Sequence, residues 1–295
     1  MKVAYVTKRA RLILAGAVSV ALVTAAPAHA AESFSDEFNG AAGASPDRSI
    51  WNFETGGGGW GNNEQQVYTS ARDNSRLDGS GHLLIQARRD GSGWTSARLN
   101  TFDKFTFTYG TLSARMAMPM GKGLHTGFWL LGEDIYNVGF PESGEVDIAE
   151  HITGSNFVHA GIHGPTTNGA PGNGSLDLGG LGLGALGSLG LGGLGDIESM
   201  ITGRYQRGSD VTDINPGQFH TYGVTKAPSK ITFTFDGKPF YSIDKSSLTA
   251  TEKWVFDKPV YVLLNVAVGG DWPGAPDADT ADDATLKVDW VRYTP

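Results

Sequence analysis

The 295-residue chain lacks cysteine altogether and carries fewer cations than anions, with 23 Lys and Arg against 31 Asp and Glu. The absence of thiols excludes thiol catalysis and thiolate metal sites. Because the net charge is -8 and the body of the chain has no basic run, nucleic acid and anionic lipid are unfavourable partners. A neutral polysaccharide is compatible with such a chain.

The chain also lacks an apolar run of the roughly 20 residues that a membrane-spanning helix needs. Its nearest approach, residues 12–26, follows four cations in residues 2–11 and precedes an Ala-x-Ala motif at residues 28–30. This order predicts a cleavable secretory signal peptide over residues 1–30, with an uncleaved anchor as the alternative. We therefore expect a secreted protein that has no membrane attachment after processing and acts as a monomer.

Helical periodicity is scarce in the rest of the chain. Removing residues 1–30, which carry four cations and no acid, takes the net charge from -8 to -12 and leaves about 265 residues, enough for one large domain over residues 31–295. Short β-rich runs bounded by turn residues recur there. The runs are His82–Arg88, Thr106–Met118, Ile231–Asp236, Val260–Val268 and Leu286–Tyr293. Together with a hairpin signal at Asp236-Gly237, they predict an all-β sandwich.

Three acids, Glu145, Asp147 and Glu150, are separated only by Val, Ile and Ala. These spacers favour a strand, in which Glu145 and Asp147 share a face. Strict alternation would turn Glu150 away, but a β-bulge near Ile148 and Ala149 would return it to that face. Two carboxyl groups in such a row could flank a glycosidic bond, as retaining glycosidases require. Acids that serve solubility, or a metal site, are the alternatives.

This acid pattern resembles the active-site strand of glycoside hydrolase family 16 in its bulged form. Six further segments resemble family motifs and follow in the family's order. They are Ser33–Gly40, Trp60–Glu64, Arg98–Thr101, Phe128–Gly132, Val268–Gly274 and Val288–Tyr293. The resemblance covers nearly the whole mature chain. It implies a β-jelly-roll sandwich whose concave sheet forms a glycan-binding cleft.

The resemblance also implies the roles of the three acids. A retaining glycosidase needs one carboxylate that attacks the anomeric carbon and one carboxylic acid that protonates the departing oxygen. By resemblance, Glu145 is the nucleophile and Glu150 the acid/base; the residues alone do not fix that order. Asp147 is expected to hydrogen-bond Glu145 and to shape a coupled titration. Crowding of like charges raises one pKa of the set and so supplies the neutral acid.

By resemblance the cleft also offers aromatic rings to sugar faces and polar groups to sugar hydroxyls. The substrate-binding candidates are Trp60, Asn62, Glu64, Arg98, Trp129, His163 and Trp272. The alternatives are core packing for Trp129, a surface salt bridge for Arg98 and a structural role for His163. At Leu124–Trp129 the chain departs from the family, which commonly has Trp-Pro-Ala before its Phe-Trp. The loss of that Trp puts one sugar subsite in question.

No cofactor is expected for catalysis, but the resemblance implies a structural calcium ion. Its ligands would be two backbone carbonyls and one late Asp, here Glu37, Gly81 and Asp289, an oxygen-only set that suits Ca²⁺. One segment departs from the family: a Gly/Leu-rich insertion at about residues 172–195. We interpret it as a flexible loop, with an apolar lid or a segment that docks on a partner or on lipid as alternatives.

These features predict a secreted endo-glycosidase that hydrolyses laminarin-type β-1,3-glucan by double displacement. Mixed-linkage glucan and agar-type galactan are alternative substrates. A transglycosylase would share the covalent intermediate and differ only in its acceptor. A non-catalytic glycan-binding protein is the third alternative, although such relatives lose one or more of the acids and this chain keeps all three.

Overall fold

The computed structural model describes residues 32–152, 154–167 and 203–295. The signal peptide expected over residues 1–30 and the insertion expected over residues 172–195 lie outside them. Within the described ranges the regular structure is nearly all β-strand, and the two helices, α1 (Ile135–Val138) and η2 (Lys245–Ser247), are single turns. No helix in these ranges is long and apolar enough to cross a membrane.

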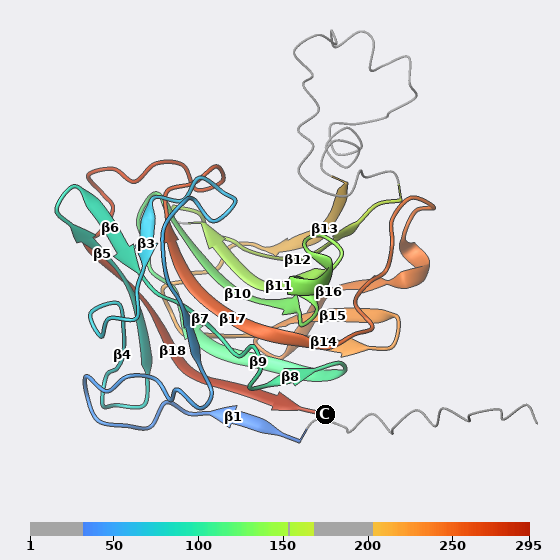
Figure 1. Cartoon of the computed structure of the whole chain (residues 1–295), viewed down its shortest axis with the longest axis horizontal. Helices are drawn as coiled ribbons and strands as arrows, with labels where there is room; N and C mark the ends of the chain where they lie inside the picture. The colour runs from blue at the N-terminus through green and yellow to red at the C-terminus, as the bar shows by residue number, and fades with distance from the viewer. Residues whose placement is uncertain (1–31, 153, 168–202) are drawn as a thin grey trace, which may run out of the picture. The chain divides into compact units, whose positions relative to one another are not determined.

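Two layers of strand make up the domain, as predicted (Figure 1). The outer sheet follows the order β16 (Lys238–Asp244), β15 (Lys230–Phe235), β14 (His220–Ala227), β9 (Gly110–Ala117), β18 (Asp283–Thr294), β5 (Leu83–Asp90), β6 (Gly93–Ser96) and β3 (Gln66–Tyr68). Two short strands extend it, β1 (Phe34–Asp36) beside β18 and β4 (Ser75–Leu77) beside β5.

The second layer, the cleft sheet, carries the acids. Its order is β13 (Arg204–Val211), β12 (Val158–Pro165), β11 (Glu145–Ile152), β10 (Leu124–Gly132), β17 (Val260–Val268), β7 (Arg98–Asn100) and β2 (Asn52–Glu54), with β8 (Thr106–Phe107) beside β17. Its strands pair antiparallel throughout. An antiparallel sheet can bury one face and leave the other open to solvent.

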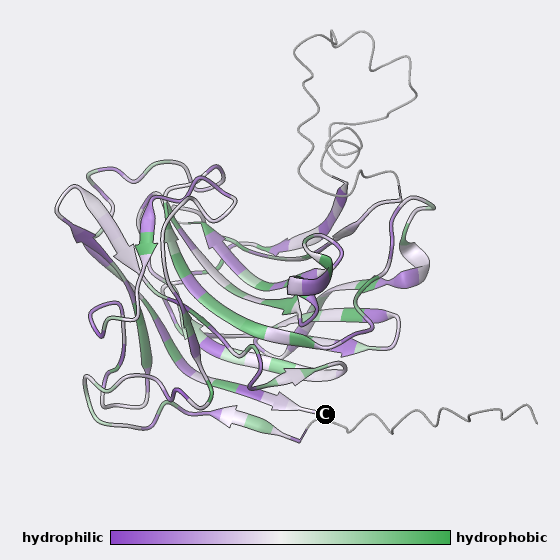
Figure 2. Cartoon of the chain, in the orientation of Figure 1, coloured by the Kyte–Doolittle hydropathy of each residue, from purple (hydrophilic) through white to green (hydrophobic). Residues whose placement is uncertain are grey.

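The core lies between the two sheets and follows the alternation of the strands. In β17, the residues Val260, Val262, Leu264, Val266 and Val268 enter the main apolar core. The apolar character of this strand is visible as a green ribbon in Figure 2. Alternate residues of β17 therefore point to the opposite face of the cleft sheet, where the site is built.

Most of the predicted strands are present, but the run Thr106–Met118 is two strands. β8 pairs with β17 in the cleft sheet, whereas β9 pairs with β14 and β18 in the outer sheet. The chain changes sheets at Gly110, where φ is 120° and a Cβ would lie 2.6 Å from the Tyr293 ring. The hairpin predicted at Asp236-Gly237 joins β15 to β16, and both turn residues have positive φ, as a type I′ turn requires.

Candidate active site

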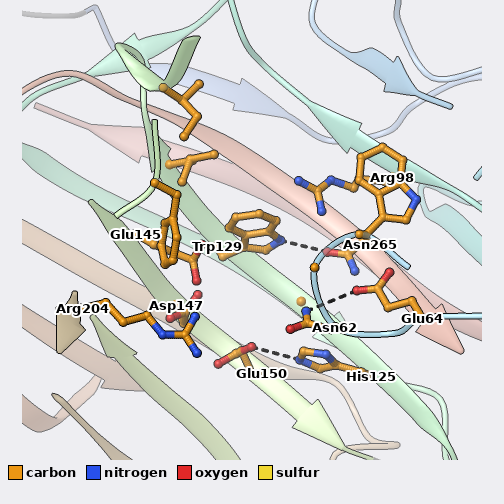
Figure 3. Close-up of a pocket in the computed structure, with 16 residues that line it drawn as sticks. Asn62, Glu64, Arg98, His125, Trp129, Glu145, Asp147, Glu150, Arg204 and Asn265 are labelled. Carbon is orange, nitrogen blue, oxygen red and sulfur yellow. Dashed lines mark hydrogen bonds and ion pairs between the residues drawn. The ribbon is translucent and has the colours of Figure 1, made fainter. Parts of the chain in front are cut away.

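The bulge predicted in the acid-bearing strand is present. Along β10, Phe128 pairs with Ala149 and Trp129 with Asp147, so Ile148 is the extra residue of β11. Pairing with β12 is interrupted over the same residues. Ile148 and Ala149 both enter the core, and the three acids line one cavity on the other side (Figure 3). The extra residue in β11 shifts the alternation of the strand, so that Glu150 lies on the same face as Glu145 and Asp147.

This cavity has a volume of about 380 Å³. Five of the predicted substrate-binding residues line it with the acids: Trp60, Asn62, Glu64, Arg98 and Trp129. Eight other lining residues were not among the predicted site residues: Gly61, His125, Gly127, Leu131, Ile135, Phe140, Arg204 and Asn265. The cavity thus combines three acids, several hydrogen-bonding groups and aromatic rings, which is the usual composition of a sugar site.

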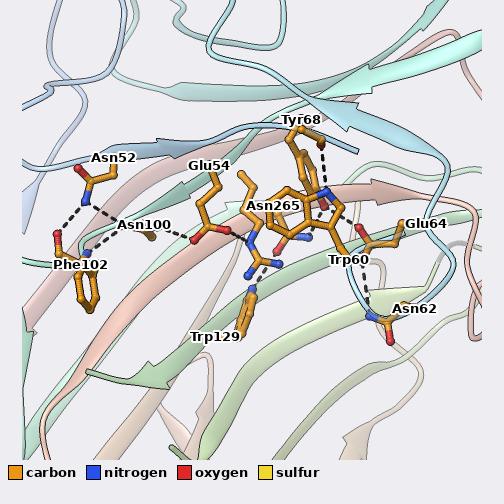
Figure 4. A network of polar contacts seen from close by, with 12 residues as sticks. Asn52, Glu54, Trp60, Asn62, Glu64, Tyr68, Asn100, Phe102, Trp129 and Asn265 are labelled. Carbon is orange, nitrogen blue, oxygen red and sulfur yellow. Dashed lines mark hydrogen bonds and ion pairs between the residues drawn. The ribbon is translucent and has the colours of Figure 1, made fainter. Parts of the chain in front are cut away.

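Arg98 lies between two indole rings. Its guanidinium carbon is 4.9 Å from the ring centroid of Trp60 and 4.7 Å from that of Trp129. The Arg98 Nε also lies 2.5 Å from a carboxylate oxygen of Glu54 on β2, so the salt bridge and the cleft position proposed as alternatives coexist (Figure 4). A guanidinium that stacks on two rings and pairs with an acid fixes the wall of the cleft.

Asn265 orients the Trp129 ring. The Trp129 Nε1 donates to Asn265 Oδ1 at 2.8 Å, and Asn265 Nδ2 donates to the Tyr68 hydroxyl at 3.1 Å (Figure 4). Tyr68 in turn donates to Glu64 at 3.2 Å. Trp129 packs with Leu131, Tyr261 and Leu263 on the cleft side of the sheet and stands outside the main core. The Trp129 ring therefore lines the cavity, and its role in sugar binding stays a prediction.

Two predicted substrate-binding residues, His163 and Trp272, do not line the cavity. The His163 Nε2 lies 3.3 Å from Asp147 Oδ2 and 3.9 Å from Glu145 Oε1, so its ring contacts the acids directly. Trp272 is 45% exposed and meets the rings of His125 and His159 edge-on, at centroid distances of 5.3 and 6.0 Å. Trp272 therefore stands next to the site, beside His125, with part of its ring free.

The pKa values of the acids are strongly perturbed. Burial, followed by the charges of Asp147 and Glu150, raises the pKa of Glu145 to about 8. Burial and the charge of Glu150 also raise the pKa of Asp147 well above its usual range. Burial acts in the same direction on Glu150 and is the largest single effect there, but the 2.9 Å hydrogen bond and the charge of His125, together with the charges of His163 and His159, outweigh it and lower the pKa of Glu150. Among the three acids, Glu150 thus holds its proton least tightly in the free protein.

The calcium prediction involves residues on the outer sheet side of the molecule. A Cβ built on Gly81 would lie 4.0 Å from the Glu37 carbonyl oxygen, so these two segments run close together. Asp289, however, accepts a 2.6 Å hydrogen bond from Arg115, and its other oxygen lies 4.0 Å from His82 Nε2. A calcium ion would have to share that carboxylate with Arg115. The calcium site stays a prediction, and it has no part in the chemistry.

The metal-site alternative for the acids points to the same place as catalysis. Among the described residues, Glu145, Asp147 and His163 each offer one ligand atom, and these atoms lie within 4.8 Å of one another. Geometry alone would allow either role for these side chains.

Comparison with known proteins shows the family of the chain. Residues 62–174 and 199–292 match glycosyl hydrolases family 16. The chain belongs to this family. It is 32% identical over 270 residues to a Beta-glucanase of Rhodothermus marinus, covering 88% of this chain and 83% of that protein. It is 35% identical to the Clotting factor G alpha subunit of Tachypleus tridentatus, covering 88% of this chain but only 33% of that protein.

The chain is also similar to a glucanase of known structure. The endo-beta-1,3-glucanase from Pyrococcus furiosus superposes with a TM-score of 0.69 at 33% identity, covering 88% of this chain and 93% of that chain. The family fold and the family sequence thus coincide over the part of the chain that carries the acid row. This glycoside hydrolase family uses carboxyl groups for its chemistry, which favours the catalytic interpretation of Glu145, Asp147 and Glu150.

Proposed function

We propose that the protein is a secreted endo-β-1,3-glucanase that cleaves laminarin-type glucan with retention of anomeric configuration. The observation that carries the proposal is the bulge of β11, which turns Glu145, Asp147 and Glu150 to one cavity. Retention requires that the Glu145 and Glu150 carboxyl groups converge to roughly 5–5.5 Å, whereas an inverting enzyme keeps them roughly 6.5–9.5 Å apart to admit a water. The similarity to the endo-beta-1,3-glucanase from Pyrococcus furiosus supports β-1,3-glucan as the substrate, and the similarity to a Beta-glucanase supports a β-glucan in general.

In the proposed reaction Glu145, whose pKa is about 8 in the free chain, first releases its proton to solvent. Its carboxylate then attacks the anomeric carbon while Glu150 protonates the departing oxygen. Water then attacks the glycosyl ester, and Glu150 accepts a proton from that water. Asp147 is buried and its pKa is raised, which favours its protonated form. We expect it to donate a hydrogen bond to Glu145 during the reaction and so to limit the charge in the row. The Trp60, Arg98 and Trp129 wall binds the sugars beside the cleaved bond.

The test is a panel of laminarin, mixed-linkage glucan and agar with sizing of the products. We expect laminarin to give a ladder of oligosaccharides, and Glu145→Gln to abolish that activity without unfolding the protein. Glu142→Gln is the matched control, because Glu142 is exposed and lies three residues away on the same chain segment. If only another glycan were cleaved, the proposed substrate would be wrong. If Glu145→Gln kept more than a few per cent of the activity, the assignment of Glu145 as the nucleophile would be wrong.

Labelled acceptor sugars, added to the same reaction, test transglycosylation. Incorporation of label into longer chains would show that an acceptor sugar, in place of water, takes the covalent intermediate. Binding of laminarin without any cleavage would instead support the glycan-binding alternative.

A further inference from the structure

His125 is bound to the acid/base residue of the proposed reaction. Its Nε2 lies 2.9 Å from Glu150 Oε1, and the two side chains are only 14% and 15% exposed (Figure 3). Strand register brings them together: Glu150 of β11 pairs with Gly127 of β10, and His125 is the next residue of β10 on the same face. Gly127 has no side chain, so the imidazole can reach diagonally across it.

The groups around His125 and Glu150 favour one proton shared between the imidazole and the carboxyl group. Burial alone would lower the pKa of His125, but the hydrogen bond and charge of Glu150 raise it, and Glu64 and Glu145 act in the same direction. On the other side, His163 and His159 of β12 add to the effect of His125 and lower the pKa of Glu150. Both shifts favour the form of the pair in which an imidazolium lies beside a carboxylate.

This resting state is at odds with the work that Glu150 must do. The first step of a retaining glycosidase needs a carboxylic acid at the departing oxygen, and a carboxylate cannot protonate it. The proton that Glu150 needs is nevertheless present, 2.9 Å away on His125 Nε2. The state with neutral His125 and protonated Glu150 holds the same number of protons, so it is reached by one short transfer.

We propose that His125 stores the proton that Glu150 delivers to the departing glycosidic oxygen, and that it holds the Glu150 carboxyl in place. The inference rests on the proposed function, because it assigns Glu150 as the acid/base. When the glycosidic bond breaks, Glu150 gives its proton to the departing oxygen and Glu145 forms the ester. The pair is then a neutral imidazole and a carboxylate. When water attacks the ester, its proton returns to Glu150 and is shared with His125 again.

The proposal gives a role to His125, which lies in the segment Leu124–Trp129 where the sequence departs from the family pattern. Where family members commonly have a Trp, this chain has a titratable ring within hydrogen-bond distance of Glu150. Trp272 packs edge-on against His125 at 5.3 Å and supplies an aromatic ring next to it. His125 is thus a positioning residue with a proton to give, and it is specific to chains with this substitution.

The dependence on the leaving group separates this role from a structural one. A dinitrophenolate departs without a proton, whereas the sugar alkoxide of laminarin does not. We expect His125→Phe to lower kcat/KM for laminarin by about 10- to 100-fold, part of the 10²- to 10⁴-fold that acid catalysis provides. For dinitrophenyl β-laminaribioside, kcat/KM should change by less than about threefold, because its cleavage needs no acid.

His125→Gln keeps a hydrogen-bond donor but has no proton to give. It should therefore resemble His125→Phe with laminarin; full activity in this variant would overturn the proton store. Equal losses on both substrates would show a structural role and would also overturn it. The matched control is His220→Gln on β14, since His220 pairs with Asp236 at 2.9 Å away from the cleft. It should behave as wild type.

A measurement on the unmodified protein guards against misfolded variants. NMR titration of the His125 ring should show a pKa above the ordinary value in wild type and a lower one in Glu150→Gln. An unperturbed His125 in wild type would overturn the proposal. Failure of the proposed function is distinguishable, because wild type would then leave laminarin intact. Failure of the proton store instead leaves wild-type activity high, with the His125 variants either unaffected or equally impaired on both substrates.

Discussion

Replacing Asn265 by Leu tests how the cleft wall is held. Asn265 accepts a hydrogen bond from the Trp129 ring and donates one to the Tyr68 hydroxyl. Both Asn265 and Tyr68 are buried, with 5% and 1% of their surface exposed. Leu has the same number and branching of side-chain heavy atoms as Asn, so no cavity forms. The change instead leaves the Trp129 N–H without its acceptor, at a cost of about 1–3 kcal/mol, and removes one hydrogen bond to Tyr68, worth about 0.5–1.5 kcal/mol.

The expected loss in the free energy of unfolding is therefore about 3 kcal/mol. In a domain of this size that corresponds to a fall in Tm of roughly 6–12 °C. Because the edge of the Trp129 ring also loses its anchor, we expect KM for laminarin to rise several-fold. Thermal unfolding by circular dichroism and a laminarin assay measure the two effects.

The control for this experiment is Asn156→Leu. Asn156 is exposed and donates only to Asp213, at 3.2 Å, so its replacement should change the unfolding free energy by less than about 0.5 kcal/mol. If Asn265→Leu melted within 2 °C of wild type, the two hydrogen bonds would not hold the Trp129 ring, and the account of the cleft wall would be wrong.

Four further predictions concern the site and its surroundings. Gly127→Ala should raise KM for laminarin, because the new Cβ would lie 2.8 Å from Asn265 Oδ1; an unchanged KM would contradict this. The pKa of Glu145 is about 8 in the folded chain against an ordinary 4.5, so the folded chain keeps a proton that the unfolded chain releases, and this group destabilises the fold as pH rises from 4.5 to 8. Glu145→Gln should therefore melt above wild type at pH 8, and the gap should close toward pH 4. If calcium binds at the site predicted around Asp289, EDTA should lower Tm and leave kcat at low temperature unchanged. An unaffected Tm would show that the prediction of a calcium site is wrong. Replacing residues 172–195 by a short Gly/Ser linker should leave Tm and turnover nearly unchanged, because loop-closure entropy varies slowly with length; weaker binding of long glucans would favour a lid.

The acid row could be predicted because its information is local. Apolar spacers define the strand, and the spacing of Glu145, Asp147 and Glu150 is satisfied on one face only if a residue is inserted between the last two. The structure has that insertion at Ile148. The wall residues Trp60 and Arg98 were likewise found through short motifs, Trp60–Glu64 and Arg98–Thr101, each of which spans only a few residues.

The contacts that complete the site are not local. Asn265 orients Trp129 and His125 binds Glu150 only because of the register between β10, β11 and β17, which no single segment encodes. Signals were nevertheless present: Asn265 is the one polar residue of the apolar strand β17, and His125 shares the alternation of Trp129. A polar residue within an otherwise buried strand indicates a partner across the sheet.

The most direct test of the central claim is the anomeric form of the first products. Proton NMR during the first minutes of laminarin-oligosaccharide hydrolysis, before mutarotation, reports the configuration at the new reducing end. Two displacements by Glu145 and then water on the same carbon restore the original configuration, so the β-anomer should appear first and the α-anomer only later. An initial excess of α-anomer would show that water attacks directly, and would contradict the assignment of the row of acids on β11 as a nucleophile and its acid/base partner.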